Sequence, residues 1–206
     1  YGAGARDGGF DIVGALWGKA DDTVKAAAEA EAAVEAQKEY GFDGWCFNGE
    51  KIYEGGGRSA AYARTFRRSC PLLPFAWTPE ARLSLDHDVL QELAVCYQPQ
   101  AYPLENHWDV TMVAEWAENF GYKPENTTPL VQAYPAPDGS RYPAADYRAQ
   151  AIAAGLSGLI LYTGARAKPS AIDGLAIDDP EHLLKWAAKD RAVATFGDAA
   201  DIAARR

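Results

Sequence analysis

The feature that most constrains the fold is a regular alternation of strand-like and helix-like segments along the 206 residues. Short runs rich in aliphatic and aromatic residues are each followed by an amphipathic or alanine-rich run. This alternation is typical of parallel sheets built by right-handed crossovers, in which a helix returns the chain to the same end of the sheet. The strand-like runs cover 10–17, 42–50, 72–77, 94–102, 129–134 and 156–162, and the helix-like runs cover 23–40, 59–69, 86–93, 110–120, 144–154 and 180–188.

The first helix-like run carries clear signals at both ends. Asp21 and Asp22 precede it and are good N-cap residues, because a short acidic side chain can accept hydrogen bonds from the free amides of the first turn. Gly41 follows Tyr40 and can adopt the left-handed conformation that ends many helices. The spacing therefore predicts a helix over 23–40.

The type of parallel sheet follows from what the strand ends lack. No glycine-rich phosphate loop of the GxGxxG or GxxxxGK[ST] type follows any strand, as an open nucleotide-binding sheet would require. Two strands end in the same tetrapeptide, at 100–103 and 132–135, as expected of equivalent positions around one barrel. We predict an α/β fold of the parallel (β/α) TIM-barrel type, formed as a single domain over 1–206, since 48% hydrophobic residues suffice for one sizeable core.

Composition excludes several classes of partner. A net charge of −9 argues against nucleic acid, whose binding draws on clustered Lys and Arg. The one basic cluster, Arg64, Arg67 and Arg68, is interpreted as a solvated helix face. No stretch reaches the roughly 18 to 20 apolar residues of a membrane span. The three cysteines show no CxxC spacing, so we expect no metal site. We also expect no cofactor. Cys46 and Cys96 are expected to be buried thiols.

Functional groups of such barrels gather at the carboxyl ends of the strands. Those positions carry aromatic and amide side chains with one carboxylate, a mixture that suits sugars, because sugar rings stack on aromatic planes and amides bind their polar substituents. Packing within the barrel is the competing explanation for each aromatic residue. The candidate catalytic residues are Glu50 and Asn48, and the candidate substrate-binding residues are Trp17, Trp77, Gln98, Gln100, Tyr102, Gln132, Tyr134 and Tyr162.

The strand-like run 42–50 (FDGWCFNGE) is the most informative segment. Because alternate residues of a strand share a face, Cys46, Asn48 and Glu50 point to one side, and Trp45 and Phe47 to the other. A carboxamide followed by a carboxylate is costly to bury without purpose, whereas at the mouth of a barrel both remain reachable. The pattern predicts a site at this strand end.

This strand resembles the catalytic strand of two glycosidase families, the family-18 chitinases (DGxDxDxE) and, more closely, the family-85 endo-β-N-acetylglucosaminidases (DGWFINQE-like). Asp43, Gly44, Trp45, Asn48 and Glu50 fall in register with the second pattern. The resemblance implies that Glu50 is the general acid/base and that Asn48 orients the 2-acetamido group, which itself attacks the anomeric carbon. A single protein carboxyl group is then sufficient for the reaction, because the substrate supplies the nucleophile. Specific similarity covers about nine residues.

The departures from the chitinase pattern are also informative. Cys46 and Asn48 stand where that pattern has its interior Asp residues, so a charge relay to the acid would have to come from elsewhere. If 42–50 is the fourth barrel strand, as the resemblance implies, the first two strands are missing. We then expect a longer protein, since Tyr1 is no initiator and Met112 is the one methionine, and we expect upstream residues or another subunit to cover the strand edge at 10–17.

Three functional hypotheses remain open. In the first, the chain is a glycoside hydrolase acting on N-acetylhexosamine-containing glycans. In the second, it is a barrel of the same descent that has no catalytic activity and instead binds glycan or forms part of a particle such as a phage tail or virion. The third, another barrel enzyme such as an aldolase or a phosphate-sugar enzyme, needs a strand-end Lys or a phosphate loop, and neither is present. For the first two we expect an extracellular or virion-associated location, a glycan partner, and no nucleic acid.

Overall fold

The computed structural model describes residues 11–102, 108–132, 144–156, 160–162 and 192–198. The chain separates into two compact units. The first comprises Tyr1–Cys96 and Ala188–Arg206, and the second comprises Tyr97–Ala187. Each unit is described by itself, and the single domain over 1–206 stays a prediction.

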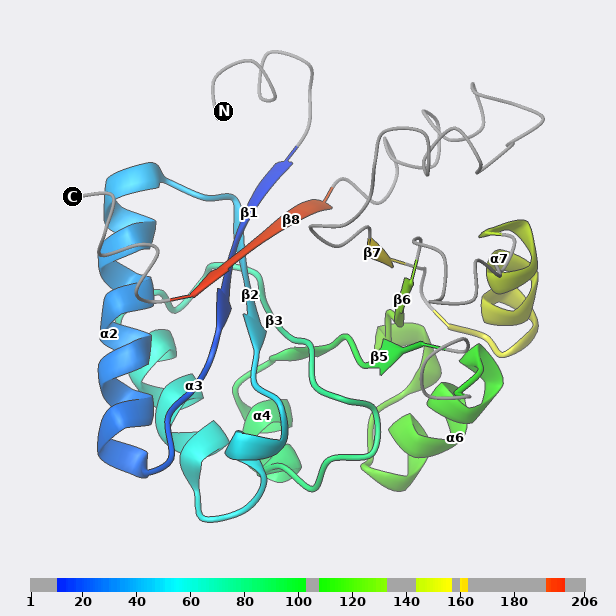
Figure 1. Cartoon of the computed structure of the whole chain (residues 1–206), viewed down its shortest axis with the longest axis horizontal. Helices are drawn as coiled ribbons and strands as arrows, with labels where there is room; N and C mark the ends of the chain where they lie inside the picture. The colour runs from blue at the N-terminus through cyan, green and yellow to red at the C-terminus, as the bar shows by residue number, and fades with distance from the viewer. Residues whose placement is uncertain (1–10, 103–107, 133–143, 157–159, 163–191, 199–206) are drawn as a thin grey trace. The chain divides into compact units, whose positions relative to one another are not determined.

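The first unit is built on a sheet with the strand order β4-β3-β2-β1-β8 (Figure 1). Its strands are β1 (Asp11–Trp17), β2 (Gly44–Asn48), β3 (Phe75–Trp77) and β8 (Ala192–Asp198). The short strand β4 (Cys96–Tyr97) contains the boundary between the units, because Tyr97 is the first residue of the second unit. β1 pairs in parallel with β2, and β2 pairs in parallel with β3. The predicted parallel arrangement of successive strands is therefore confirmed for these three.

The outer edge of β1 differs from the expectation. β8 pairs in parallel with β1 along its whole length, from Asp11 with Ala192 to Trp17 with Asp198. The two strands lie side by side in Figure 1. The expectation that upstream residues or another subunit cover this edge is thus corrected, because a strand near the C-terminal end of the same chain pairs there. Residues 192–198 were not predicted as a strand, since nothing in their local pattern shows which edge they can pair with.

Among the described residues of the first unit, three α-helices and a 3₁₀ turn follow the strands. α2 (Thr23–Tyr40) has the predicted bounds: Asp22 caps its first turn by accepting from the amide of Lys25 at 2.7 Å, and Gly41 ends it at φ 60°. The turn η1 (Lys51–Tyr53) precedes α3 (Arg58–Ser69), and α4 (His87–Glu92) follows β3. Both helices lie close to the predicted ranges 59–69 and 86–93.

The core of this unit lies between the sheet and its helices. Leu16, Trp45, Phe47, Phe75 and Trp77 point from the three central strands toward Tyr62 and Phe66 of α3 and the alanine face of α2. Phe47 is the centre of the aromatic cluster, with its ring centroid 3.7 Å from that of Tyr62 and 4.5 Å from that of Trp77. Small alanines at positions 26, 30 and 33 are fully buried and let α2 approach closely.

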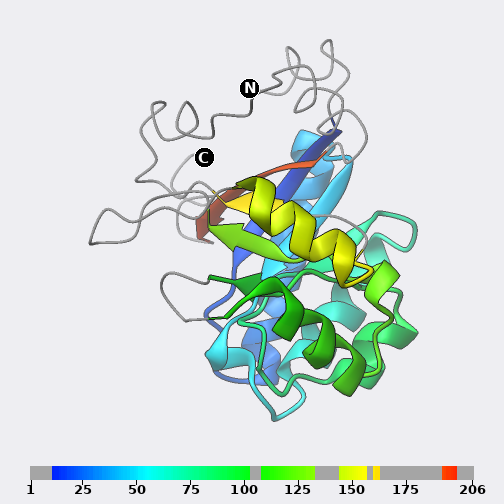
Figure 2. The same cartoon turned by 90° about the vertical axis from the view of Figure 1, so that its right-hand side faces the viewer.

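The second unit has a parallel sheet of its own, in the order β5-β6-β7. β5 covers Gln100–Ala101, β6 covers Leu130–Gln132 and β7 covers Ile160–Tyr162, with α6 (Val110–Asn119), η2 (Pro124–Asn126) and α7 (Ala144–Ala153) between them. In Figure 2 the two α-helices lie side by side on one side of this sheet. Tyr97 stacks on Tyr122 in its core, with ring centroids 4.6 Å apart.

The barrel prediction is confirmed in its fold class and in its parallel strands. The fold is α/β with parallel strands, and the described residues form two sheets rather than one closed ring. The predicted strand 94–102 is divided between β4 in the first sheet and β5 in the second. The predicted helix at 180–188 lies outside the described residues.

Candidate active site

The candidate site lies at the carboxyl end of β2. Asn48 is the last residue of the strand, and Glu50 follows it as the residue before η1. The Asn48 carboxamide Nδ2 donates to Glu50 Oε1 at 3.1 Å, and both side chains are half-buried. Cys46, Asn48 and Glu50 therefore share a face, while Trp45 and Phe47 enter the helix-facing core, as the alternation predicts.

Trp17 stands beside this pair on the neighbouring strand. It is in register with Asn48 across the parallel ladder, and register partners of adjacent strands point to the same side. Trp17 is 46% exposed, whereas Leu16 before it is fully buried. An exposed indole is thus placed beside Asn48, whose carboxamide contacts the Glu50 carboxylate.

Cys46 and Thr78 lie below Asn48 and contact each other. The Cys46 thiol donates to Thr78 Oγ1 at 3.6 Å, and the Thr78 hydroxyl donates to the carbonyl of Phe47 at 3.2 Å. Burial raises the pKa of Cys46 to about 12, although the contact with Thr78 works against the shift, so the thiol stays protonated at neutral pH. Cys46 therefore brings no negative charge beneath Asn48.

Backbone contacts fix the loops on either side of the pair. The amide of Gly18 donates to the carbonyl of Asn48 at 2.9 Å, and the indole of Trp77 donates to the carbonyl of Gly49 at 3.2 Å. The amide of Tyr53 donates to the carbonyl of Glu50 at 2.7 Å and closes the 3₁₀ turn. Glu50 thus projects from a well-anchored backbone.

Trp77 is a correction to the predicted site. It pairs in register with Phe47 and points with it into the core, where it is fully buried. It supports Gly49 from below and presents no surface to a ligand. The strand-end residue on the side of Asn48 is Thr78, one position later. It was not predicted as a site residue because the register of β3 with β2 cannot be read from the three residues of β3 alone.

The remaining predicted residues belong to the second unit. Gln98 is half-buried, Gln100 in β5 is 6% exposed, and Tyr102 directly after it is 9% exposed. Gln132 in β6 pairs in register with Tyr162 in β7. Tyr134 lies outside the described residues. The structure thus brings together Trp17, Asn48 and Glu50, all from the first unit, and the contribution of the others to one site stays a prediction.

The described residues were also considered for metal-binding clusters, membrane spans and disulfides, in that order. They contain no group of three or more His, Cys, Asp or Glu side chains arranged to hold a metal ion. Among the helices that the structure describes, none is long and apolar enough to cross a membrane. The cysteines are all free thiols, Cys46 buried as expected and Cys96, against expectation, exposed.

Comparison with known proteins relates the fold to solved structures. No protein-family model matches the chain, and no curated protein matches it significantly. The chain is similar to the endo-β-N-acetylglucosaminidase from Cordyceps militaris in its apo form, with a TM-score of 0.51 and 11% identity over 82% of this chain and 70% of that one. At this identity the likeness concerns the fold alone.

Other α/β enzymes match less well. A mandelate racemase/muconate lactonizing protein from Paracoccus denitrificans gives a TM-score of 0.43 at 12% identity over 75% of this chain and 47% of that one. The N-acetyl-D-glucosamine-6-phosphate deacetylase from Mycobacterium smegmatis gives 0.43 at 11% identity over 77% and 49%. The chain spans about half the length of each of these two proteins.

Proposed function

We propose that the protein is a glycoside hydrolase acting on N-acetylhexosamine-containing glycans, with Glu50 as general acid/base and Asn48 as the residue that orients the 2-acetamido group. The observation that carries this proposal is the contact between Asn48 Nδ2 and Glu50 Oε1 at 3.1 Å, at the carboxyl end of a central parallel strand. A carboxyl group held by a neighbouring carboxamide at this edge of the sheet is suited to proton transfer and to acetamido recognition.

The surroundings of the pair support a sugar substrate. The exposed ring of Trp17 lies on the same face of the sheet as Asn48 and offers an apolar plane for a pyranose ring. The distant structural likeness to an endo-β-N-acetylglucosaminidase is in keeping with the same class of substrate. We further propose that Gln98, Gln100, Tyr102, Gln132, Tyr134 and Tyr162 line the remainder of the substrate site, and that the protein acts outside the cell or on a virion.

The reaction needs one protein carboxyl group. The acetamido oxygen of the substrate forms a bond to the anomeric carbon while the glycosidic bond breaks and Glu50 gives its proton to the leaving oxygen. Water then opens the cyclic intermediate as Glu50 takes a proton back, and the configuration at the anomeric carbon is retained. Asn48 holds the acetamido group in the orientation for attack.

A second candidate function is glycan binding, or a structural role in a particle, without catalysis. It is favoured by the buried Cys46 beneath Asn48, because a thiol with a pKa of about 12 cannot act as the charged relay that an interior Asp supplies in the chitinase pattern. Binding needs only the exposed ring and the amides.

The Glu50→Gln variant separates the two candidates. If Glu50 is the acid, turnover of chitooligosaccharides, peptidoglycan fragments or high-mannose glycopeptides falls by about 10² to 10⁴-fold, while the fold and glycan affinity stay nearly unchanged, because Gln keeps the shape and loses the proton. Asn48→Ala lowers the rate as well, and substrates without the 2-acetamido group resist cleavage because they lack the nucleophile.

The matched control is Glu31→Gln, which removes the same charge from an exposed position on α2 and leaves turnover unchanged. If the wild-type protein cleaves none of these glycans but binds one of them, and Glu50→Gln binds it equally well, the catalytic proposal fails and the binding function replaces it.

A further inference from the structure

We propose that Glu29 and Tyr53 are positioning residues for Glu50, and that the single carboxylate of Glu29 ties together the two loops that follow β1 and β2. The inference rests on the proposed function, because it assigns a role toward the proposed acid. It concerns residues of the first unit alone.

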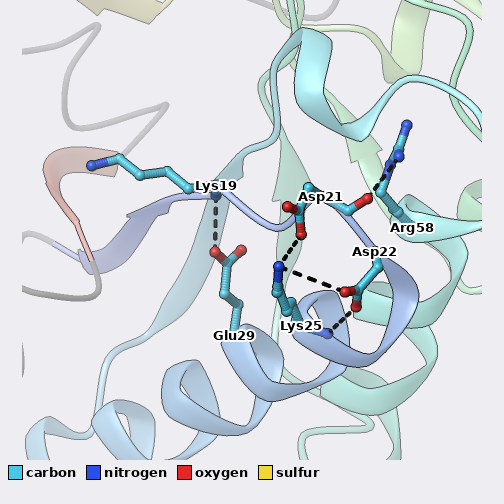
Figure 3. A network of polar contacts seen from close by, with 6 residues as sticks. All are labelled: Lys19, Asp21, Asp22, Lys25, Glu29 and Arg58. Atoms are coloured by element: carbon cyan, nitrogen blue, oxygen red, sulfur yellow. Dashed lines mark hydrogen bonds and ion pairs between the residues drawn. The ribbon is translucent and has the colours of Figure 1, made fainter.

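Glu29 contacts the two loops with its two carboxylate oxygens. Oε1 accepts a hydrogen bond from the backbone amide of Lys19 at 2.9 Å, and Oε2 accepts one from the hydroxyl of Tyr53 at 2.5 Å. Figure 3 shows the first contact, which joins α2 to the loop after β1 and is separate from the surface contacts among Asp21, Asp22 and Lys25. One helix residue thus holds one atom from each loop.

The Tyr53 contact reaches Glu50 through a single turn. Tyr53 is fully buried, and its ring packs against Phe47 and Trp77 with centroid distances of 5.0 and 5.5 Å. Its backbone amide donates to the carbonyl of Glu50 at 2.7 Å. Fixing the Tyr53 hydroxyl therefore fixes the end of the 3₁₀ turn that follows Glu50, and with it the direction in which the Glu50 side chain leaves the backbone.

The Lys19 contact reaches the other half of the site. Lys19 is two residues beyond Trp17, and the intervening Gly18 donates its amide to the carbonyl of Asn48 at 2.9 Å. Glu29 therefore sets the path of the chain directly after the exposed indole as well as the turn after the carboxylate. One side chain thus adds a contact to the segment after Trp17 and to the turn after Glu50, beside the backbone contacts that anchor both.

The chemistry of Glu29 explains why this position carries a carboxylate. A carboxylate is an acceptor at both oxygens, so it can serve a backbone N–H and a phenolic O–H together. A carboxamide has one acceptor oxygen, and its NH₂ group would face one of the two donors. Burial, and then the hydrogen bond to Glu29, raise the pKa of Tyr53 far above its ordinary value, so its hydroxyl remains a donor throughout the working pH range.

Tyr62 provides a matched control for the loss of a buried hydroxyl. It belongs to the same aromatic cluster and is also fully buried, but its hydroxyl accepts from the indole of Trp45 at 3.0 Å. That contact links α3 to the middle of β2 and does not reach Glu50 or Trp17. Tyr53→Phe and Tyr62→Phe therefore remove the same atom from similar surroundings, with only the first change connected to the site.

The experiment compares Tyr53→Phe, Glu29→Gln and their combination with Tyr62→Phe and Glu31→Gln in the full chain. On a glycan that the wild type hydrolyses, kcat falls on the order of 10- to 100-fold for Tyr53→Phe and Glu29→Gln while KM changes less than about 3-fold, because misplacing a reacting group affects the transition state more than ground-state binding. The double variant is no slower than about the slower single variant, since both changes break one contact.

A second readout does not depend on activity. The side-chain amide resonances of Asn48 in a ¹⁵N-labelled sample, assigned by their loss in Asn48→Ser, report its hydrogen bond to Glu50. They shift or broaden in Tyr53→Phe and Glu29→Gln and stay in place in the two controls. If all four single variants leave these resonances unchanged, or if Tyr62→Phe disturbs them as much as Tyr53→Phe, the positioning role is refuted.

The two readouts distinguish the two proposals. A wild-type protein that hydrolyses no glycan while its Asn48 resonances respond only to Tyr53→Phe and Glu29→Gln would refute the catalytic function and keep the positioning of the Asn48–Glu50 pair. Hydrolysis by the wild type with equal kcat in Tyr53→Phe and Tyr62→Phe would keep the catalytic function and refute the positioning role.

Discussion

At the scale of the residue, the face of a strand that a side chain occupies decides whether it can meet a ligand. The alternation within 42–50 was sufficient to place Asn48 and Glu50 on one side and Phe47 on the other, because the period of two belongs to the strand itself. For Trp77 the same reasoning gave the wrong side. Which residues of β3 face the helices depends on its register with β2, and a shift of one residue reverses every side chain.

Gly49 is predicted to be intolerant of any side chain. A Cβ at this position would lie 2.4 Å from Cζ2 of the buried Trp77 ring and 2.7 Å from Cε1 of Phe47, and neither ring has room to move in the aromatic core. We expect Gly49→Ala to lower the free energy of unfolding by about 1 to 3 kcal/mol, the usual cost of overpacking. Urea denaturation followed by tryptophan fluorescence measures the change.

Gly55 supplies the control on the other side of η1. It has a positive φ of 69° but nothing within 4 Å of an added Cβ. Gly55→Asn should cost less than about 1 kcal/mol, because Asn tolerates the left-handed conformation. Equal destabilisation by the two variants would contradict the prediction, because it would mean that the rings beneath Gly49 move to accommodate the added methyl group.

At the scale of the element, Arg67 attaches α3 to the loops at the opposite end of the strands. The basic cluster of Arg64, Arg67 and Arg68 was interpreted as a solvated face, which holds for the exposed first and third members. The guanidinium of Arg67 instead donates to the backbone carbonyls of Leu73, Leu93 and Ala94. Its Cζ also lies 5.6 Å from the centroid of the Phe75 ring.

Arg67→Lys is predicted to destabilise the fold although it conserves the charge. A single ammonium group cannot reach three carbonyls in the planar geometry of a guanidinium, so at least one partly buried carbonyl loses its donor. The expected loss is about 1 to 3 kcal/mol in the free energy of unfolding, measured by chemical denaturation. Arg64→Lys and Arg68→Lys on the same helix are the controls, and a loss of similar size in either would show that the carbonyl contacts are not the cause.

At the scale of the whole molecule, the order of the described strands in the first sheet depends on pairing between segments that are distant in the sequence. β8 pairs with β1 across about 180 residues of sequence, with seven register partners from Asp11 to Trp17. An uncovered β1 would present unpaired backbone donors and acceptors along that length. β8 therefore protects the strand that carries Trp17.

A pair of truncations tests this protection. A chain ending at residue 191 lacks β8, whereas a chain ending at residue 198 keeps it. We expect the shorter chain to melt at a lower temperature and to associate at increasing concentration, because the edge of β1 becomes available for pairing. Differential scanning calorimetry and light scattering on both chains measure this, and matching melts with both chains monomeric would contradict it.

The sequence by itself determined what depends on neighbours along the chain. The alternation of elements, the bounds of α2 between Asp22 and Gly41, and the common face of Asn48 and Glu50 all follow from local propensity and periodicity. Only the tertiary structure decided the burial of Trp77, the pairing of β8 with β1, and the meeting of Glu29 with Tyr53, which are 24 positions apart. Each of these depends on register or on packing between segments, and such contacts leave no periodic signal in either segment alone.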